Sequence, residues 1–287
     1  MLVILGTTSI AFAIIRRDDV GDEAYIVEAE EYAAVADLLE PGDCLATLIT
    51  PRWAVSAAHC VRHVELPLTL TFGTQSVQVA GTVCNRRFDG EWHDIALVHL
   101  AEPVAGVEPI ELYRGDDELG QQVIFVGRGD TATGLTGQDG ASLDLLTRRA
   151  TNTVAEANAR WIKFVFNAPG DPEVTELEGI SGDGDSGGPA FIETADGRRL
   201  AGLSAYQDAS GRRLGKYGVT EVYTRVSRYQ EFVDEVTGDD WDGEYTRCNT
   251  CSVSAPGAGG SPPWVLLVAL FVAWRISSET RSRNASR

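Results

Sequence analysis

Residues 184–189 read Gly-Asp-Ser-Gly-Gly-Pro, and this string constrains the chain more than any other stretch. A serine hydroxyl becomes an effective nucleophile only when a base removes its proton and hydrogen-bond donors stabilise the resulting oxyanion. Glycine at 184 permits a backbone conformation that lets the N–H groups of Gly184 and Ser186 converge on one point. The alternative is a glycine-rich turn between strands. A candidate base elsewhere in the chain would favour a nucleophilic serine over a simple turn.

Two upstream segments supply a base and a carboxylate. Residues 53–60 are an apolar run ending Ala-Ala-His-Cys, and residues 93–100 begin His-Asp and continue as an apolar strand. Acyl transfer by serine needs a histidine to move the proton and a buried carboxylate to hold the histidine tautomer. The chain order His59, Asp94, Ser186 matches the chymotrypsin-type triad and differs from the order in subtilisins and α/β-hydrolases.

The segments Ala-Ala-His-Cys, Asp-Ile-Ala-Leu and Gly-Asp-Ser-Gly-Gly-Pro resemble those of the trypsin/chymotrypsin-like serine proteases (the S1 family) over roughly residues 14–237. The resemblance implies that His59 is the general base, Asp94 its partner and Ser186 the nucleophile. Gly184 and Ser186 would supply the oxyanion N–H groups. It also implies an all-β fold of two six-stranded antiparallel β-barrels with a C-terminal helix.

The expected function is that of a secreted or surface-associated serine endopeptidase acting through an acyl-enzyme. One alternative is a protease-like fold that has lost activity and serves as a binding or regulatory module. The other is an esterase or transacylase that uses the same triad. Labelling of Ser186 by a fluorophosphonate distinguishes an active enzyme from the inactive module. A comparison of peptide with ester substrates distinguishes an endopeptidase from an esterase.

The charge of the chain bears on its partners. A formal net charge of −18 argues against nucleic acid, because phosphate binding needs clustered Lys and Arg. Residues 275–287 hold four Arg and one Glu, a charge of +3, so the remaining chain carries −21. The charge thus excludes nucleic acid as a partner. Separately, we expect a protein or peptide substrate, no cofactor or metal, and a monomer.

The chain has five cysteines, at positions 44, 60, 84, 248 and 251. The resemblance implies a disulfide between Cys44 and Cys60 that closes the histidine loop, and hence an oxidising, extracytoplasmic compartment. The sequence assigns no partner to Cys84. Residues 248–251 form a C-x-x-C, but no second such motif or His pair accompanies it, so no zinc site is expected.

Residues 1–13 are apolar and end Ala-Phe-Ala, which predicts a signal peptide; the alternative is a buried N-terminal strand. The first barrel is expected over residues 14–115, and the second barrel with its helix over 116–238. Residues 239–261 are an acidic, then Gly/Ser/Ala-rich spacer.

Residues 262–287 combine a short apolar run, 264–274, with an arginine tail. With the preceding cysteine motif they resemble the C-terminal sorting signals of Gram-negative surface proteins, especially the Cys-containing myxobacterial type. The alternative is a plain membrane anchor, although 11 apolar residues are about half of what a spanning helix needs. We expect an extracytoplasmic bacterial protein, secreted or at the cell surface or outer membrane, with transient membrane anchoring through this segment.

Local patterns predict individual elements. Strands are expected at residues 47–49, 53–56, 68–72, 76–83, 161–166 and 200–206, with the second barrel beginning near Gln121. Residues 130–140 are rich in Gly, Thr and Asp, which predicts a mobile surface loop. Ser227 and Gln230 form a capping-box pattern ahead of apolar residues at helical spacing, which predicts an amphipathic helix.

Substrate preference is read from the resemblance. The residue six before the nucleophile, Ile180, would lie at the base of the specificity pocket, and Gln207 and Glu221 would line it. Here Ala205-Tyr206-Gln207 replaces the family's Ser-Trp-Gly, and Gly182 replaces a cysteine. An apolar floor favours small or hydrophobic side chains, whereas a desolvated Glu221 carboxylate favours a substrate Lys or Arg. A third possibility is that Glu221 points away and pairs with Arg225.

In this family a newly freed apolar α-amino group folds inward and pairs with the aspartate before the nucleophile, here Asp185. Ile14 follows the Ala-Phe-Ala site, so its α-amino group is the expected partner; Ile26-Val27 is a competing start. Arg16-Arg17 stands where the family has Gly-Gly.

The remaining three histidines stand apart from the candidate triad. We expect His63 and His99 to have no role. His93 is a candidate for the rim of the active site because it directly precedes Asp94.

Overall fold

The computed structural model describes residues 14–39, 43–62, 64–238 and 245. The predicted signal peptide, most of the spacer, the C-terminal sorting segment and His63 therefore lie outside the described residues. Within the described residues, no helix combines the length and apolar character needed to cross a membrane.

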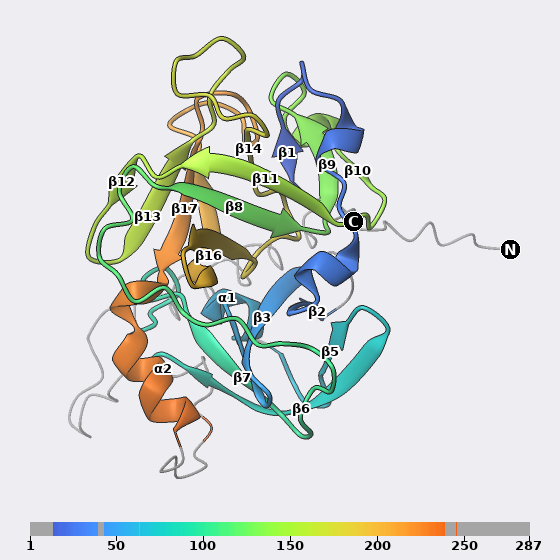
Figure 1. Ribbon diagram of the computed structural model, residues 1–287, viewed down its shortest axis with the longest axis vertical. Coiled ribbons are helices and arrows are strands. Elements are labelled where there is room, and N and C mark those ends of the chain that lie inside the picture. The colour runs from blue at the N-terminus through green and yellow to red at the C-terminus, as the bar shows by residue number, and fades with distance from the viewer. Residues whose placement is uncertain (1–13, 40–42, 63, 239–244, 246–287) are drawn as a thin grey trace, which may run out of the picture. The chain divides into compact units, whose positions relative to one another are not determined.

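Six strands close into an antiparallel barrel in the order β2-β3-β4-β7-β6-β5 (Figure 1). They are β2 (Val35–Leu38), β3 (Cys44–Thr50), β4 (Trp53–Ser56), β5 (Thr69–Phe72), β6 (Gln75–Cys84) and β7 (Ala96–Leu100). The strands predicted in this half of the chain all fall within it. Small and branched side chains fill the interior, among them Ala36, Leu48 and Val98, which are fully buried.

Seven further strands form one antiparallel sheet in the order β11-β8-β15-β16-β17-β13-β12. They are β8 (Gln122–Gly127), β11 (Arg148–Thr153), β12 (Glu156–Ala157), β13 (Trp161–Val165), β15 (Pro189–Thr194), β16 (Gly197–Asp208) and β17 (Thr220–Arg225). The Asn152 side-chain amide on β11 donates to the Val165 carbonyl on β13 at 2.9 Å, so the two sides of the sheet curl toward each other. The all-β, two-barrel fold class is confirmed, with a curled seven-stranded sheet as its second half.

A small four-stranded sheet, β10-β9-β1-β14, stands beside these barrels (Figure 1). It consists of β1 (Ile15–Arg16), β9 (Asp130–Thr133), β10 (Ser142–Leu143) and β14 (Gly179–Ile180). The prediction of a loop throughout residues 130–140 is therefore wrong for its first four residues. They form a strand because β1, more than 100 residues earlier, supplies the hydrogen-bond partner, and a local pattern carries no sign of such a partner.

The helices are short. They comprise α1 (Ala58–Val61), α2 (Gln230–Thr237) and the 3-10 turns η1 (Asp22–Ala24), η2 (Ala29–Tyr32), η3 (Gln138–Gly140) and η4 (Val226–Arg228). The predicted C-terminal helix is confirmed as α2, which buries Val233 and Val236. The capping box is wrong, because Tyr229 occupies the cap position without a side-chain hydrogen bond. Ser227 Oγ donates instead to Glu118 Oε1 at 2.6 Å, since that carboxylate is buried and needs donors.

A shared apolar cluster joins the barrel to the seven-stranded sheet. Leu45 and Leu97 of the barrel belong to the same buried cluster as Leu203 of β16 and Val233 of α2. Polar links reinforce this junction: Arg128 Nη1 lies 3.1 Å from Asp37 Oδ2. Residues contributed by both halves of the chain are thereby fixed at one junction, where the candidate site lies.

Candidate active site

His59 and Asp94 form a two-point contact. His59 Nδ1 lies 2.6 Å from Asp94 Oδ2, and the His59 backbone N–H donates to Asp94 Oδ1 at 2.8 Å. Asp94 is buried, whereas 26% of the His59 side chain is exposed. Nδ1 held by a buried carboxylate leaves Nε2 as the nitrogen available for proton transfer.

His59 lies in the short helix α1, and the backbone of Asp94 is hydrogen-bonded to β17. The expected disulfide between Cys44 and Cys60 is confirmed, and it ties α1 to the start of β3. Thr224 Oγ1 on β17 donates to the Asp94 carbonyl at 2.8 Å. The His–Asp pair is thus held by both halves of the chain.

The cysteines around His59 do not form a metal site. Cys44, His59 and Cys60 bring potential ligand atoms close together. The two sulfurs are bonded to each other, however, and so are not thiolates. Cys84 is disulfide-bonded as well.

Ser186 lies in a tight turn. Gly184 has φ of +89°, in the region that favours glycine. The Asp185 N–H donates to the Gly182 carbonyl at 3.2 Å, and the Gly188 N–H donates to the Asp185 carbonyl at 2.8 Å. Ser186 itself is half-buried. The turn therefore presents the hydroxyl-bearing residue at its apex.

This turn packs against the segment that carries the histidine. The Leu45 N–H donates to the Ser186 carbonyl at 2.8 Å, and the Gly187 N–H donates to the Ser204 carbonyl at 2.9 Å. A Cβ at Gly187 would clash with Ser56 Oγ, three residues before His59. Within the described part of the chain no hydrogen bond joins Ser186 to His59; bonds of this kind often tighten only when substrate binds.

Ser181 connects the residues predicted to set substrate preference. Ser181 Oγ donates to Glu221 Oε1, and the Ser181 carbonyl accepts from Gln207 Nε2 at 2.7 Å. Ile180, the preceding residue, is fully buried. Ile180, Gln207 and Glu221 are therefore brought together around one serine.

Glu221 is fully buried and incompletely satisfied. Its Oε2 has no hydrogen-bond partner in the described part of the chain. Burial raises the pKa of Glu221 well above the usual value for a glutamate, although the Ser181 hydroxyl opposes the shift. The predicted alternative pairing with Arg225 is wrong: Arg225 forms its ion pair with Glu118, which is also buried.

The N-terminal strand β1 lies next to the predicted specificity residues. Ile15 pairs with Ile180 on β14 and with Ala132 on β9. Ile14 and Ile15 are both fully buried, whereas 38% of Ile26 is exposed.

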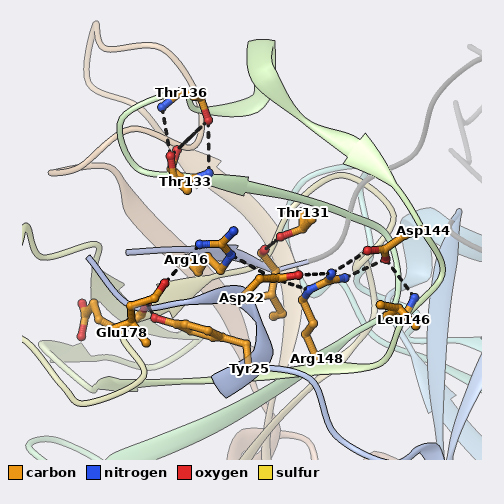
Figure 2. Close-up of polar contacts among 12 residues, drawn as sticks. Arg16, Asp22, Tyr25, Thr131, Thr133, Thr136, Asp144, Leu146, Arg148 and Glu178 are labelled. Atoms are coloured by element: carbon orange, nitrogen blue, oxygen red, sulfur yellow. Dashed lines mark hydrogen bonds and ion pairs between the residues drawn. The ribbon is translucent and has the colours of Figure 1, made fainter. Parts of the chain in front are cut away.

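The two arginines after Ile15 turn away from this core. Arg16 Nε donates to Asp22 Oδ1 at 2.9 Å, and Arg17 makes two 2.6 Å bonds to Asp19 (Figure 2 shows the Arg16 contact). Local carboxylates thus accommodate these residues where the family has glycines.

Asp185 is buried beneath the Ser186 turn. Its carboxylate accepts the backbone N–H groups of Arg128 at 3.1 Å, Gly129 at 3.3 Å and Gly182 at 3.0 Å. Burial nevertheless raises the pKa of Asp185 to about 7. No ion pair reaches this carboxylate from the described residues.

Two histidines outside the His59–Asp94 pair have partners of their own. His93 Nδ1 lies 3.2 Å from the Tyr229 hydroxyl, and burial lowers the pKa of His93. His99 stacks on Trp53, with ring centroids 4.3 Å apart.

Several residues that position the site carry no signal in the sequence. Ser181 and Thr224 carry hydroxyls to Glu221 and to the Asp94 backbone, and neither belongs to a recognisable motif. Asp130 lies fully buried in the segment predicted to be a surface loop. The only signal for Asp130 was its closeness in sequence to Gly127 and Gly129.

Two β-barrel halves with a His–Asp pair and a glycine-flanked serine turn at their junction define a protease-type fold. The family model described as Trypsin matches residues 28–233. The chain belongs to the trypsin family, and it contains a trypsin-like serine protease domain.

Curated proteins of the same family show moderate similarity. Kallikrein-15 of Saguinus oedipus is 30% identical over 244 residues, which cover 75% of this chain and 92% of that protein. Transmembrane protease serine 11B of Homo sapiens is 30% identical over 211 residues, covering 68% of this chain and 50% of the relative. Transmembrane protease serine 11E of Mus musculus is 29% identical over 237 residues, covering 74% and 53%. The chain thus spans about half the length of the two transmembrane proteases.

Proposed function

We propose that the chain is a secreted or surface-associated serine endopeptidase that cleaves peptide bonds through an acyl-enzyme on Ser186. The observation that carries the proposal is the two-point contact between His59 and Asp94 beside the Ser186 turn. A histidine with Nδ1 held by a buried carboxylate is oriented to act through Nε2. Membership of the trypsin family supports the same reading.

In the proposed reaction, Ser186 Oγ bonds to the substrate carbonyl carbon while His59 Nε2 takes the hydroxyl proton. The N–H groups of Gly184 and Ser186 stabilise the oxyanion, and the loss of one such donor typically costs about 100- to 1000-fold in kcat. The peptide C–N bond then breaks as His59 gives the proton to the leaving amine. Water then bonds to the acyl carbon while His59 takes one of its protons. The ester bond to Ser186 Oγ breaks, His59 returns the proton to this oxygen, and the carboxylic acid is released. Asp94 stays ionised throughout and holds the imidazolium.

Substrate preference is proposed to be mixed. Ile180 is apolar and fully buried, and among the described residues no donor reaches the buried Glu221 Oε2. A buried carboxyl group favours its neutral form unless a cation arrives. We therefore propose that apolar residues are accepted at the cleavage position with neutral Glu221. Lysine is accepted when Glu221 releases its proton to solvent and the lysine ammonium pairs with the resulting carboxylate.

Activation is proposed to follow removal of residues 1–13. The burial of Ile14 and the pairing of Ile15 with Ile180 support a start at Ile14, and the exposure of Ile26 counts against the competing start. Asp185, buried without an ion pair, is the proposed partner of the freed α-ammonium group. Pairing would lock the turn that presents Ser186.

The decisive experiment is labelling with a biotinylated fluorophosphonate, followed by mass spectrometry of the modified peptide. We expect modification at Ser186 in wild-type protein beginning at Ile14, and none in Ser186→Ala. Absence of labelling in wild type would favour the inactive binding module. Labelling with turnover of esters but not of peptides would favour the esterase.

A further inference from the structure

Asp130 is a buried carboxylate without a partner among the described residues. It begins β9, is fully buried, and neither of its carboxylate oxygens has a hydrogen-bond donor. Burial, together with the nearby carboxylates of Asp144 and Asp183, raises the pKa of Asp130 to about 6. A native fold seldom retains such a group unless something else satisfies it.

The strand register places Asp130 beside the amino side of Ile14. β9 runs parallel to β1 with Ala132 opposite Ile15, so Thr131 lies level with Ile14 and Asp130 precedes that level by one residue. Thr131 Oγ1 donates to the Ile14 carbonyl at 3.4 Å, in keeping with this register (Figure 2 labels Thr131). Side chains alternate along a strand, so Asp130 faces the same side as Ala132, which packs against Ile15.

Asp185 is hydrogen-bonded to the segment that leads into β9. Two of its three backbone donors are Arg128 and Gly129, the residues immediately before Asp130. Asp185 therefore has three N–H donors, whereas Asp130 has none. The Asp185 carboxylate is therefore bound by the two residues that precede Asp130, and the two carboxylates differ in how well the backbone satisfies them.

The neighbouring cations are already engaged. Arg16 bonds to Asp22, and the fully buried Arg148 bonds to both Asp22 and Asp144 (Figure 2). Asp183, the remaining charged neighbour, accepts from Gln138 at 3.1 Å. Across the described residues, no ion pair reaches Asp130 from β1, β10, β11 or the Ser186 turn. Its counter-ion must come from elsewhere.

We propose that Asp130 is a second counter-ion for the α-ammonium group of the protein that begins at Ile14, acting together with Asp185. The inference rests on the processing step proposed above. An α-ammonium group has three N–H donors and can bond to both carboxylates at once. Asp130 is then a positioning residue: it holds the amino terminus, which holds Asp185 and the Ser186 turn.

The first test compares stability before and after processing. In protein that retains residues 1–13, ionised Asp130 opposes folding above pH 6, so Asp130→Asn should raise the thermal midpoint at pH 8, by about 2–4 °C. In protein beginning at Ile14 the same substitution removes an ion pair and should lower the midpoint by a similar amount. Asp139 is an exposed aspartate paired with Arg213, and Asp139→Asn is the matched control. It should change the thermal midpoint by the same small amount in both forms. A shift of the same sign in both forms for Asp130→Asn would overturn the proposal.

The second test reads the α-amino group directly. The pH dependence of Ile14 carbamylation by cyanate reports its pKa, and the alkaline limb of kcat/KM reports the active conformation. Asp130→Asn should lower the pKa of the α-amino group and the apparent pKa of the alkaline limb by about one unit each, because one of two carboxylates is lost. Asp130→Glu should keep both pKa values close to those of wild type. Unchanged carbamylation and an unchanged limb in Asp130→Asn would refute the role of Asp130; Asp130→Ser serves if the asparagine variant does not fold.

Asp185→Asn, measured alongside, separates this proposal from the one on which it rests. If Asp185→Asn moves the alkaline limb and Asp130→Asn does not, only the role of Asp130 fails. If neither variant moves it, or if protein retaining residues 1–13 is fully active, the proposed activation at Ile14 fails.

Discussion

The Tyr245 hydroxyl lies 2.9 Å from Nδ1 of His99, 146 residues earlier in the chain. The Tyr245 ring also covers Gly81, where a Cβ would overlap it. His99 in turn stacks on Trp53. A residue of the predicted spacer therefore packs on the barrel beyond the end of α2, and a protein cut at residue 238 loses this contact.

Tyr245→Ala should lower the thermal midpoint by about 2–4 °C, because removal of the ring exposes the surface of His99 and Gly81 that it covers. Tyr245→Phe should lose less, since it keeps the packing and removes only the hydrogen bond. Leu119→Ala, at an exposed side chain, is the control. Equal midpoints for Tyr245→Ala and wild type, measured by circular dichroism, would show that the contact contributes nothing to stability.

Asp94→Asn should reduce kcat/KM for a peptide substrate by about 10,000-fold, because the amide holds His59 in the wrong tautomer. Ser186→Ala and His59→Ala should each lose a similar factor, and combining them should add little, since triad members act as a unit. All three proteins should keep the wild-type far-UV spectrum. Hydrolysis by Ser186→Ala at a tenth of the wild-type rate would contradict the assignment of the nucleophile.

Glu221→Gln should abolish the cleavage after lysine that ionised Glu221 supports, and should leave cleavage after alanine nearly unchanged. In wild type, the ratio of kcat/KM for lysine substrates to that for alanine substrates should rise with pH. Burial raises the pKa of Glu221, so the carboxylate that binds lysine forms only as the pH increases. A ratio independent of both pH and Glu221 would contradict the proposed preference.

The same substitution has an expected effect on stability. The folded-state pKa of Glu221 is raised above its ordinary value, so its contribution is fully present at acidic pH and is lost as pH rises through the folded pKa. Glu221→Gln should therefore be neutral near pH 4 and stabilising at neutral and higher pH. Denaturant unfolding at several pH values measures the difference, and a constant difference across them would exclude the ionisation argument.

Deletion of residues 262–287 should release active enzyme into the medium if this segment is a sorting or anchoring signal, because its apolar run and arginine tail would be gone. Cell fractionation with a peptide assay measures this, and the Ser186→Ala form of the same deletion provides the background. Unchanged association with membranes would count against an anchoring role.

The sequence by itself was sufficient to select His59, Asp94 and Ser186 as the candidate triad, and the resemblance of these segments to the family predicted the all-β fold. Each lies in a short run whose neighbours carry the information: small residues before His59, an apolar strand after Asp94, and glycines around Ser186. The Cys44–Cys60 disulfide likewise followed from the resemblance and is present.

Only the tertiary structure decided the surroundings of the carboxylates. Asp130 reads as a loop residue, yet it is buried because β1 pairs with β9 across more than 100 residues. The sequence allowed Glu221 to pair with Arg225, but in the fold Arg225 forms an ion pair with Glu118. Glu221 accepts a hydrogen bond from Ser181 instead. Desolvation and non-local strand pairing depend on what lies nearby in space, and a run of neighbouring residues in sequence does not contain that information.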